Sequence, residues 1–344
     1  MASFLTLTSA VLAAFVVSAL LTRRFCNPSS RWHVLDHPNE RSLHTRPTPR
    51  TGGVAIFGSL IVAFAWWLPW TGTMPLMYGL GAGAGLVAVL SFLDDRTGLP
   101  VRIRLAGHVV AAVLVVGGGI YLPEISVPGL VSQMPGWFGK AFSLLFLIWM
   151  INLYNFMDGM DGLAGGMAVF GFGTFALLGL MAGNPVFLGI NLVIAAAAGG
   201  FLLFNFPPAR IFMGDTGSAS LGLLAGGVSL WGAQDGVFPF WVALLVFSPF
   251  IVDATVTLLR RLFNGEAVWE AHRKHFYQRL VQSGWGHRKT AFYEYGLMAA
   301  CGGSALLGRQ LGESGQVVLI VIWCCAYLIL MGIVDRLERR KLQT

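Results

Sequence analysis

Charged residues are scarce in this chain of 344 residues, and their scarcity excludes most classes of soluble protein. Asp, Glu, Lys and Arg make up 11% of the sequence, whereas soluble domains carry about 25%. Hydrophobic residues reach 56%, and glycine adds 44 residues more. The composition also excludes intrinsic disorder, which requires low hydrophobicity and high charge. A protein with many membrane-spanning helices is the class that remains.

Cysteine is rare as well, and long polar segments are few. The four cysteines have no spacing typical of a disulfide framework or a zinc site. No internal repeat and no soluble domain is evident, so we interpret residues 1–344 as a single transmembrane domain. The net charge of +7 is explained by basic loops beside a membrane, and it gives no reason to expect a nucleic-acid partner. Membrane lipid is the partner that this composition does imply.

Apolar stretches long enough to cross a bilayer recur along the whole sequence. We therefore predict an all-α fold with about eleven transmembrane helices. These helices are expected at residues 3–22, 52–70, 76–93, 105–122, 140–156, 162–182, 187–205, 218–233, 239–259, 291–309 and 316–334.

The basic residues fall almost entirely on one side of these predicted helices. With the N-terminus outside, all of the 23 Lys and Arg except Lys140 and Arg309 lie in alternate loops or in the C-terminal tail. The positive-inside rule places those loops and the C-terminus in the cytoplasm, which requires an odd number of helices. We predict cytoplasmic loops at about residues 23–51, 94–104, 157–161, 206–217 and 260–290.

Five aspartates belong to three of these cytoplasmic loops, and a helical bundle can bring them together. Crowded carboxylates repel one another, and a divalent cation relieves that repulsion. Oxygen ligands suit Mg²⁺, with Mn²⁺ as the other candidate ion. We therefore predict a Mg²⁺–phosphate site, although a helix cap or a surface position is the alternative for any single aspartate. The five are Asp94, Asp95, Asp158, Asp161 and Asp215.

Neutral residues near the aspartates indicate contacts to a phosphorylated substrate. Gly214, beside an aspartate, allows backbone N–H groups to approach a phosphate. Phe212 is an aromatic residue at a polar membrane surface, where it can stack on a base or simply pack at the interface. Asn155 lies three residues before Asp158, and Asp161 lies three after it, so these side chains share one face if the helix continues.

Two basic loops offer positive charge for phosphates. Arg46 belongs to the first loop, where ordinary positive-inside charge also explains it. In the loop at 260–290, a helix would place His272, His275 and Arg279 on one face that can hold a diphosphate, with Arg273 beside them. An amphipathic helix at the membrane interface is the alternative.

One proline is placed to interrupt a predicted span. Pro249 lies within the ninth apolar stretch, so we expect it to bend or break that helix. Such a break can open a lateral groove for lipid. Asp253 would then lie within the span and face protein rather than lipid.

Five motifs, in this order, resemble those of the polyprenyl-phosphate N-acetylhexosamine-1-phosphate transferases, glycosyltransferase family 4. That superfamily includes the phospho-MurNAc-pentapeptide translocase and the enzymes that initiate O-antigen, enterobacterial common antigen and teichoic acid linkage. The motifs are RSLHTRPTPRTGG, SFLDDRTGLPVRIRL, NLYNFMDGMDGLAGG, FNFPPARIFMGDTGSASLG and EAHRKHFYQRL, within residues 36–290 or so.

The resemblance implies a reaction and a setting. A sugar-1-phosphate passes from a UDP-N-acetylhexosamine to undecaprenyl phosphate, UMP leaves, and Mg²⁺ is required. The implied place is the bacterial cytoplasmic (inner) membrane, crossed many times, with the active site on the cytoplasmic face. The resemblance is also compatible with a homodimer.

The resemblance and the patterns above together give the expected site residues. Asp94 is expected to be the base at the lipid phosphate, Asn155 and Asn205 to bind substrate, and Phe212 to stack on uracil. The predicted catalytic set is Asp94, Asp95, Asp158, Asp161 and His275. The predicted substrate-binding set is Arg46, Asn155, Asn205, Phe212, Gly214, His272, Arg273 and Arg279. The predicted metal ligands are Asp215 and Asp95.

The histidine motif departs from the family pattern. Initiators of common antigen and teichoic linkage resemble H-I-H-H and the translocase has three consecutive histidines, whereas this chain has His275-Phe276-Tyr277-Gln278. The chain therefore looks more like initiators of O-antigen or capsule that use UDP-N-acetylated 6-deoxyhexoses or UDP-GlcNAc. The same chemistry with UDP-GlcNAc for teichoic or common-antigen linkage is one alternative. A transporter with an acidic relay on the cytoplasmic side is another, and a covalent aspartyl intermediate is an open mechanism.

Overall fold

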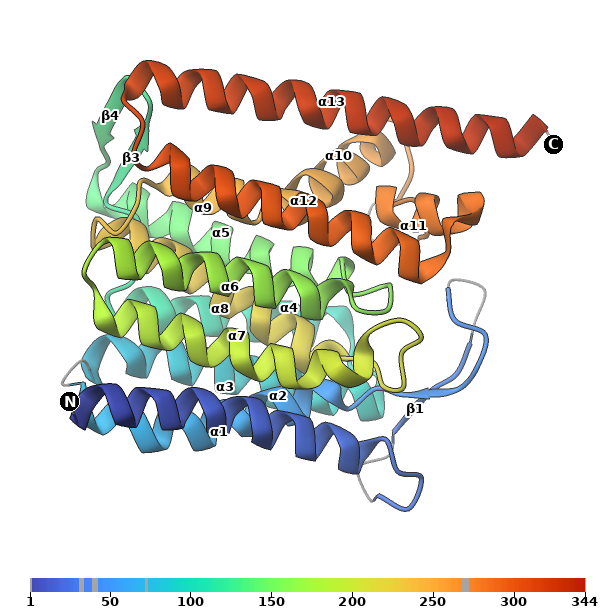
Figure 1. Cartoon of the computed structure of the whole chain (residues 1–344), viewed down its shortest axis with the longest axis horizontal. Coiled ribbons are helices and arrows are strands. Elements are labelled where there is room, and N and C mark those ends of the chain that lie inside the picture. The colour runs from blue at the N-terminus through green and yellow to red at the C-terminus, as the bar shows by residue number, and fades with distance from the viewer. Residues whose placement is uncertain (1, 31–33, 39–42, 72–73, 268–271, 344) are drawn as a thin grey trace.

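The computed structural model describes residues 2–30, 34–38, 43–71, 74–267 and 272–343, which are overwhelmingly helical. Long helices lie side by side and run back and forth between two ends of the molecule (Figure 1). The long helices are α1 (Ala2–Phe25), α2 (Gly52–Trp67), α3 (Met74–Thr97), α4 (Val101–Gly117), α5 (Gly136–Phe156), α6 (Leu163–Met181), α7 (Pro185–Asn205), α8 (Asp215–Gln234), α10 (Ser248–Phe263), α12 (Gly286–Gly308) and α13 (Glu313–Gln343). The short ones are η1 (Leu68–Trp70), α9 (Phe240–Val246), α11 (Phe276–Leu280) and η2 (Val281–Trp285).

The all-α prediction is confirmed, and each predicted apolar stretch corresponds to a helix or to the α9–α10 pair. Among the described residues, seven helices are long and apolar enough to cross a membrane, or up to eight if the bent pair counts as one span. Helices α4, α8 and α12 fall outside that set. The count of eleven spans and their orientation therefore stay predictions.

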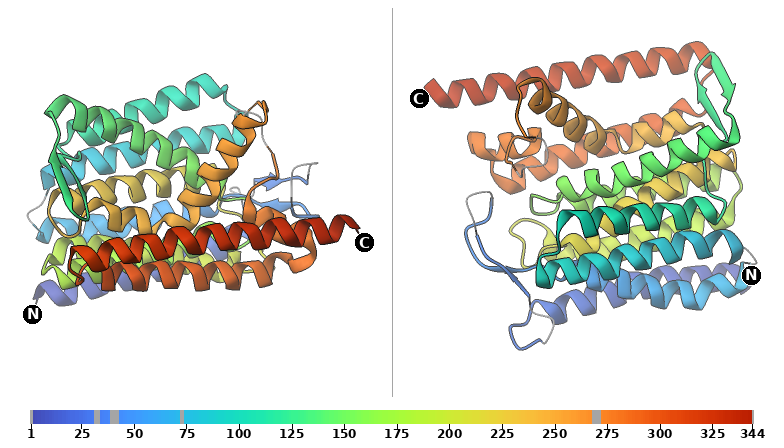
Figure 2. Two further views of the ribbon diagram at one scale, coloured as in Figure 1. Left: turned by 90° about the horizontal axis from the view of Figure 1, so that it is seen from above. Right: turned by 180° about the vertical axis from the view of Figure 1, so that it is seen from behind.

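Two small antiparallel ribbons mark opposite ends of the bundle. Strands β1 (Leu35–Asp36) and β2 (Thr48–Pro49) pair at one end, and β3 (Glu124–Val127) and β4 (Leu130–Gln133) pair at the other. The views in Figure 2 place β1 and β2 at the same end as α11 and the C-terminal end of α13. We call this the polar end, because the loops predicted to be cytoplasmic gather there.

Helix α8 is the centre of the bundle. Its residues 216–232 are all buried, and it packs chiefly between α3 and α5. Small residues allow this approach in a membrane protein, where close backbone contact replaces the hydrophobic effect. A methyl group at Gly53 in α2 would overlap the backbone of Gly217, so glycine is required where α2 meets the first turn of α8.

The ninth predicted span is broken, as Pro249 predicts. Helices α9 and α10 meet at an angle of 80°, and Pro249 lies in the first turn of α10. Proline is tolerated there because the first N–H groups of a helix have no partner within it. Asp253 is 7% exposed and accepts hydrogen bonds from the backbone of α11, although it also lines an apolar groove described below.

Two helical expectations are wrong. Helix α5 ends at Phe156, and Gly162 has a φ of 76°, so Asp158 and Asp161 lie in a loop and not on a continued helix. Helix α11 begins only at Phe276, so His272 lies in the loop before it. The three-residue spacings therefore do not describe how these side chains come together.

The contact between Gly53 and Gly217 gives a stability prediction. We expect Gly53→Ala to lower the free energy of unfolding by about 1–3 kcal/mol, because the added methyl group overpacks the contact between α2 and α8. The matched control is Gly81→Ala in α3, where a Cβ has nothing within 4 Å. We expect that change to be neutral or slightly stabilising, since alanine favours a helix. Thermal melting in detergent checks both, and equal melting temperatures would contradict the packing argument.

Candidate functional site

A polar cavity of about 390 Å³ lies at the polar end of the bundle. Its wall draws on α3, α5, α8, α11 and the loops between them, which lie far apart in the sequence. Most of the predicted site residues meet here, although the loop that carries Asp158 and Asp161 is not helical as expected. The predicted residues in this wall are Asp95, Asn155, Asp158, Asp161, Asn205, Phe212, Gly214 and Asp215.

The carboxylate of Asp95 is fixed at the N-terminus of α8. Its Oδ2 accepts hydrogen bonds from the backbone N–H of Thr216 at 3.2 Å and from the Thr216 hydroxyl at 2.9 Å. A helix N-terminus favours a negative charge at this place. Gly214 has a φ of 72°, and a side chain there would strike the backbone of Arg50, so glycine is required beside the aspartates.

Asp215 begins α8 and faces the cavity. The amide of Asn155 donates a hydrogen bond to its Oδ1 at 2.9 Å, and Arg104 Nη1 lies 3.7 Å from its Oδ2. The side chain of Asp215 is still 37% exposed, so part of the carboxylate stays open to a ligand. A carboxylate held by an amide and one distant cation is well placed to bind a cation or a protonated group.

Asp158 experiences the crowding most strongly. Burial raises the pKa of this carboxyl well above its usual range, and the negative charges of Asp215 and Asp95 raise it further. No hydrogen bond to its carboxylate is present among the residues that the structure describes. A positive ligand in the cavity would favour the ionised form of Asp158.

Asp161 and Asn205 join the two loops that flank the cavity. Asp161 Oδ2 accepts a hydrogen bond from the backbone N–H of Ala209 at 2.9 Å. Asn205 Oδ1 accepts one from Gly162 N–H at 3.0 Å, and its amide donates to the carbonyl of Ile211 at 2.9 Å. Both side chains therefore line the cavity and also hold its loops in place.

Asp94 and Arg46 lie beside this cavity instead of in its wall. Asp94 accepts hydrogen bonds from the backbone N–H of Leu99 at 2.6 Å and from Arg104 Nη1 at 3.1 Å. It therefore holds Arg104 toward Asp215, and its role as a base stays a prediction. Arg46 lines a neighbouring cavity of about 530 Å³, which shares Asp161, Phe212 and His287 with the first, among others.

The predicted residues of the histidine motif do not line the polar cavity. His275 is buried, and its Nδ1 lies 3.0 Å from Asp253 Oδ1. The same Asp253 carboxylate accepts hydrogen bonds from the backbone N–H of Phe276 and Tyr277. Asp253 and His275 therefore fix the start of α11, whose Gln278 does reach the cavity.

The remaining basic-loop residues also lie elsewhere. Arg273 and Arg279 line a separate pocket that includes Glu338 of α13. The ring of His272 lies against that of His275, with ring centroids 4.8 Å apart. These positions do not bring the predicted phosphate-binding face to the aspartates, and the roles of these three residues stay predictions.

Sequence reasoning missed His44 and His287, and it considered Arg50 only as a candidate for phosphate contact beside Arg46. Arg50 belongs to the same motif as Arg46, and only the fold shows that it is Arg50 that approaches Asp95, with Nε 3.9 Å from Oδ1. His44 packs edge-on against Phe212, with ring centroids 4.8 Å apart. His287 Nδ1 lies 3.1 Å from Asp161 Oδ1. The two residues of each pair lie far apart in the sequence, so no local sequence pattern predicts their contact.

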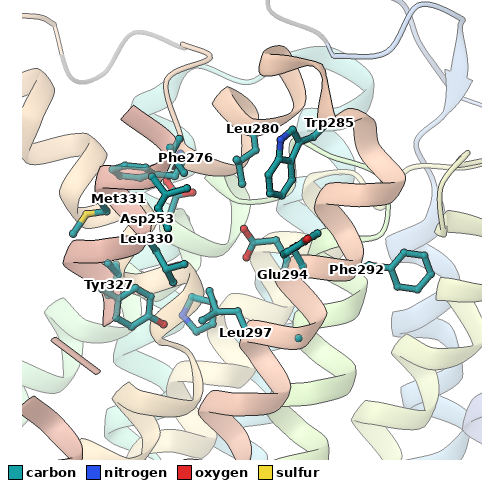
Figure 3. Close-up of a pocket in the computed structure, with 16 residues that line it drawn as sticks. Asp253, Phe276, Leu280, Trp285, Phe292, Glu294, Leu297, Tyr327, Leu330 and Met331 are labelled. Carbon is teal, nitrogen blue, oxygen red and sulfur yellow. Dashed lines mark hydrogen bonds between the residues drawn. The ribbon is translucent and has the colours of Figure 1, made fainter. Parts of the chain in front are cut away.

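An apolar groove of about 520 Å³ opens beside the break between α9 and α10, bounded by α10, α11, α12 and α13. Figure 3 shows Phe276, Leu280, Trp285 and Met331 around it, with the Glu294 carboxylate among them. A groove therefore does lie beside the break at Pro249, and its use by lipid stays a prediction. We call it the lateral groove.

Sequence comparison identifies known proteins that are similar to this chain. Residues 77–233 match Glycosyl transferase family 4. A probable undecaprenyl-phosphate N-acetylglucosaminyl 1-phosphate transferase of Bacillus subtilis is 32% identical, over 83% of this chain and 81% of that protein. A decaprenyl-phosphate N-acetylglucosaminephosphotransferase of Mycolicibacterium smegmatis is 30% identical, over 89% and 83%. A phospho-N-acetylmuramoyl-pentapeptide-transferase of Lactobacillus gasseri is 26% identical, over 80% and 85%.

The pair of His287 and Asp161 gives a prediction about pH. Burial lowers the pKa of His287, but the hydrogen bond and the charge of Asp161 raise it more, so the net shift is upward. The pair therefore makes its full contribution to stability when the pH is below about 6.5, the ordinary pKa of histidine. That contribution is lost as the pH rises through the raised pKa of His287.

We expect His287→Gln, which keeps a donor but not the charge, to lower the melting temperature most below pH 6.5 or so and progressively less at higher pH. The exposed His37 provides the control His37→Gln, which should follow the wild-type profile. If His287→Gln lowers the melting temperature by the same amount at every pH, the result would contradict a charged pair.

Proposed function

This chain belongs to glycosyl transferase family 4, the polyprenyl-phosphate sugar-phosphate transferases, and we propose that it transfers N-acetylhexosamine-1-phosphate from a UDP-sugar to undecaprenyl phosphate. An oxygen of the lipid phosphate attacks the phosphorus attached to the sugar, the bond to the UMP oxygen breaks, and UMP leaves. One observation carries the proposal. A cavity lined by Asp95, Asp158, Asp161 and Asp215 lies at the same end of the bundle as an apolar groove open to the side.

The two adjoining polar cavities suit the nucleotide sugar. Together they have the extent of a drug-sized ligand site, and they share the edge formed by Phe212 and His287. The Phe212 ring can stack on a uracil, and His44 holds that ring edge-on. Arg46 and Arg288 line the outer cavity, where they can contact a phosphate or the sugar.

The cavity suits Mg²⁺, with Mn²⁺ as the other candidate. No group of three or more His, Cys, Asp or Glu close enough to hold a metal is found within the described residues. Mg²⁺ usually binds through one or two carboxylates together with waters and substrate phosphates, and the open Asp215 with its neighbour Asp95 meets that need. The ion would neutralise charge on the diphosphate.

The residues of this chain then have separate tasks. Asn155 orients the Asp215 carboxylate, and Arg104, held by Asp94, lies close enough to offset negative charge there. Asp158 lines the cavity without a hydrogen-bond partner for its carboxylate in the described part of the chain. It is therefore as good a candidate as Asp94 to accept the proton of the lipid phosphate.

The lateral groove suits the polyprenyl chain of the acceptor. Its wall is apolar apart from a few side chains such as Asp253 and Glu294, and it includes Phe276 and Leu280 of α11, which lies at the polar end. A lipid lying there would keep its chain in the membrane and present its phosphate toward the aspartates. We propose that the chemistry takes place on the cytoplasmic face of a bacterial inner membrane, which is the side that the positive-inside rule predicts for these loops.

The donor sugar and the pathway are finer proposals. The named relatives that act on N-acetylglucosamine favour UDP-GlcNAc, whereas the histidine motif favours initiators of O-antigen or capsule, including those that use 6-deoxy sugars. We propose a role in initiating a surface polysaccharide, with a homodimer as the expected assembly.

The reaction is tested by release of UMP from a panel of UDP-N-acetylhexosamines, using the purified chain, undecaprenyl phosphate and Mg²⁺. We expect one sugar to release UMP only when both the lipid and the metal ion are present. Exchange of labelled UMP into the UDP-sugar without lipid would indicate a covalent aspartyl intermediate instead of direct transfer. Absence of UMP release with every sugar, together with no thermal stabilisation by UDP, would refute the enzyme proposal.

The metal assignment is tested by Asp215→Asn. We expect kcat to fall by about 10²–10³-fold, because a charged group that stabilises the transition state is lost. The matched control is Asp235→Asn at the other end of α8, which keeps an acceptor for the Trp231 indole N–H and lies far from the cavity. Equal activities for the two variants would contradict the assignment.

A further inference from the structure

A basic pocket lies next to the apolar groove, on the other side of α11 from the polar cavity. It has a volume of about 260 Å³, and it is lined by residues of the end of α10, α11 and α13, together with Asn264, Glu266, Arg273 and Lys274. Gln278 of α11 lines the polar cavity, whereas the next residue, Arg279, lines this pocket. A ligand bound here would therefore be separate from the aspartates.

The described residues of the pocket carry more positive than negative charge. Its basic side chains are Arg260, Arg261, Arg273, Lys274 and Arg279. Three carboxylates pair with them. Glu266 forms ion pairs with Arg261 and Lys274. Asp335 pairs with Arg260 and Arg279, and Glu338 also pairs with Arg279. Among the described residues, these five cations therefore face three anions.

The surplus is centred on an exposed residue. Arg273 is exposed, and no acidic group forms an ion pair with it among the described residues. Its neighbours hold their guanidinium groups in place, because Arg260 and Arg279 both lie over the ring of Phe276, at 4.9 and 5.2 Å from its centroid. An exposed cation beside two guanidinium groups that are held in place is suited to a phosphate, which accepts several charge-assisted hydrogen bonds.

The surroundings of the pocket indicate that this phosphate belongs to a lipid. The end of α10 exposes Leu259, Leu262 and Phe263, which are 43%, 57% and 83% exposed. The last two of these side chains lie three and four residues after the first, so all three share one side of the helix, and Arg260 and Arg261 lie on the other. The end of α10 therefore presents one apolar face and one basic face. Amphipathic helices of this kind lie where lipid chains meet headgroups.

We propose that the basic pocket binds the phosphate of an anionic membrane phospholipid, whose acyl chains rest in the bilayer against Leu259, Leu262 and Phe263. The phospholipid then sits beside the mouth of the lateral groove, since Phe276 lines both the groove and the pocket. The chemistry recognised is a phosphodiester on an amphiphile. This inference does not depend on the proposed transferase activity.

The test counts lipids retained by the purified full-length chain in neutral detergent, using native mass spectrometry with phosphatidylglycerol or phosphatidylcholine of the same acyl chains. We expect the wild type to retain phosphatidylglycerol preferentially. Arg273→Gln combined with Lys274→Gln should weaken that retention by about 30-fold, since each basic group near an anionic membrane surface contributes about fivefold. The control removes the same charge from exposed positions of α13 outside the pocket, as Arg339→Gln with Arg340→Gln.

Three outcomes would overturn the proposal. The first is equal loss of phosphatidylglycerol in the pocket and control variants at equal melting temperatures. The second is displacement of the lipid by millimolar inorganic phosphate, which would indicate a site for free phosphate. The third is displacement by undecaprenyl phosphate at a lower concentration than by phosphatidylglycerol itself, which would make the pocket a site for the acceptor. Failure of UMP release leaves this measurement unaffected, so the two proposals are separable.

Discussion

The hydrogen bonds between Asp95 and Thr216 join the end of α3 to the start of α8, and the polar cavity depends on that junction. They hold a nearly buried carboxylate at a helix N-terminus, where the partial positive charge of the backbone stabilises it. The junction requires glycine at position 214, because the Arg50 backbone approaches closely there. Asp215 follows at once, so its direction into the cavity is set by the same contact.

This junction brings negative charges together at the polar end of the bundle. The raised pKa of Asp158 is the electrostatic result, because burial and two neighbouring carboxylates oppose its ionisation. Arg50 and Arg104 offset part of the charge, yet each lies over 3.5 Å from the aspartate that lines the cavity. Carboxylates crowded in this way repel an anion that arrives alone. The site suits an anionic substrate that arrives with a cation.

The sequence predicted features that depend on local composition. Long apolar runs indicated the helices, Pro249 indicated the break, and the aspartates with their neighbouring glycines indicated the polar site. Features set by distant contacts were not predictable in this way. Helix α11 begins at Phe276 because Asp253, more than twenty residues earlier, accepts its first N–H groups. Arg279 turns away from the aspartates because its carboxylate partners lie on α13, where no local pattern connects them.

Helix α11 is only five residues long, yet it separates three chemical environments. Gln278 faces the polar cavity, Leu280 faces the apolar groove, and Arg279 faces the basic pocket. So short a helix has little stability of its own, and the contacts of Asp253 with His275 and the backbone hold it in place. We infer that the histidine motif of this chain acts through position. It fixes α11 between the polar cavity, the apolar groove and the basic pocket, and its first histidine is buried against Asp253 and lines none of the three.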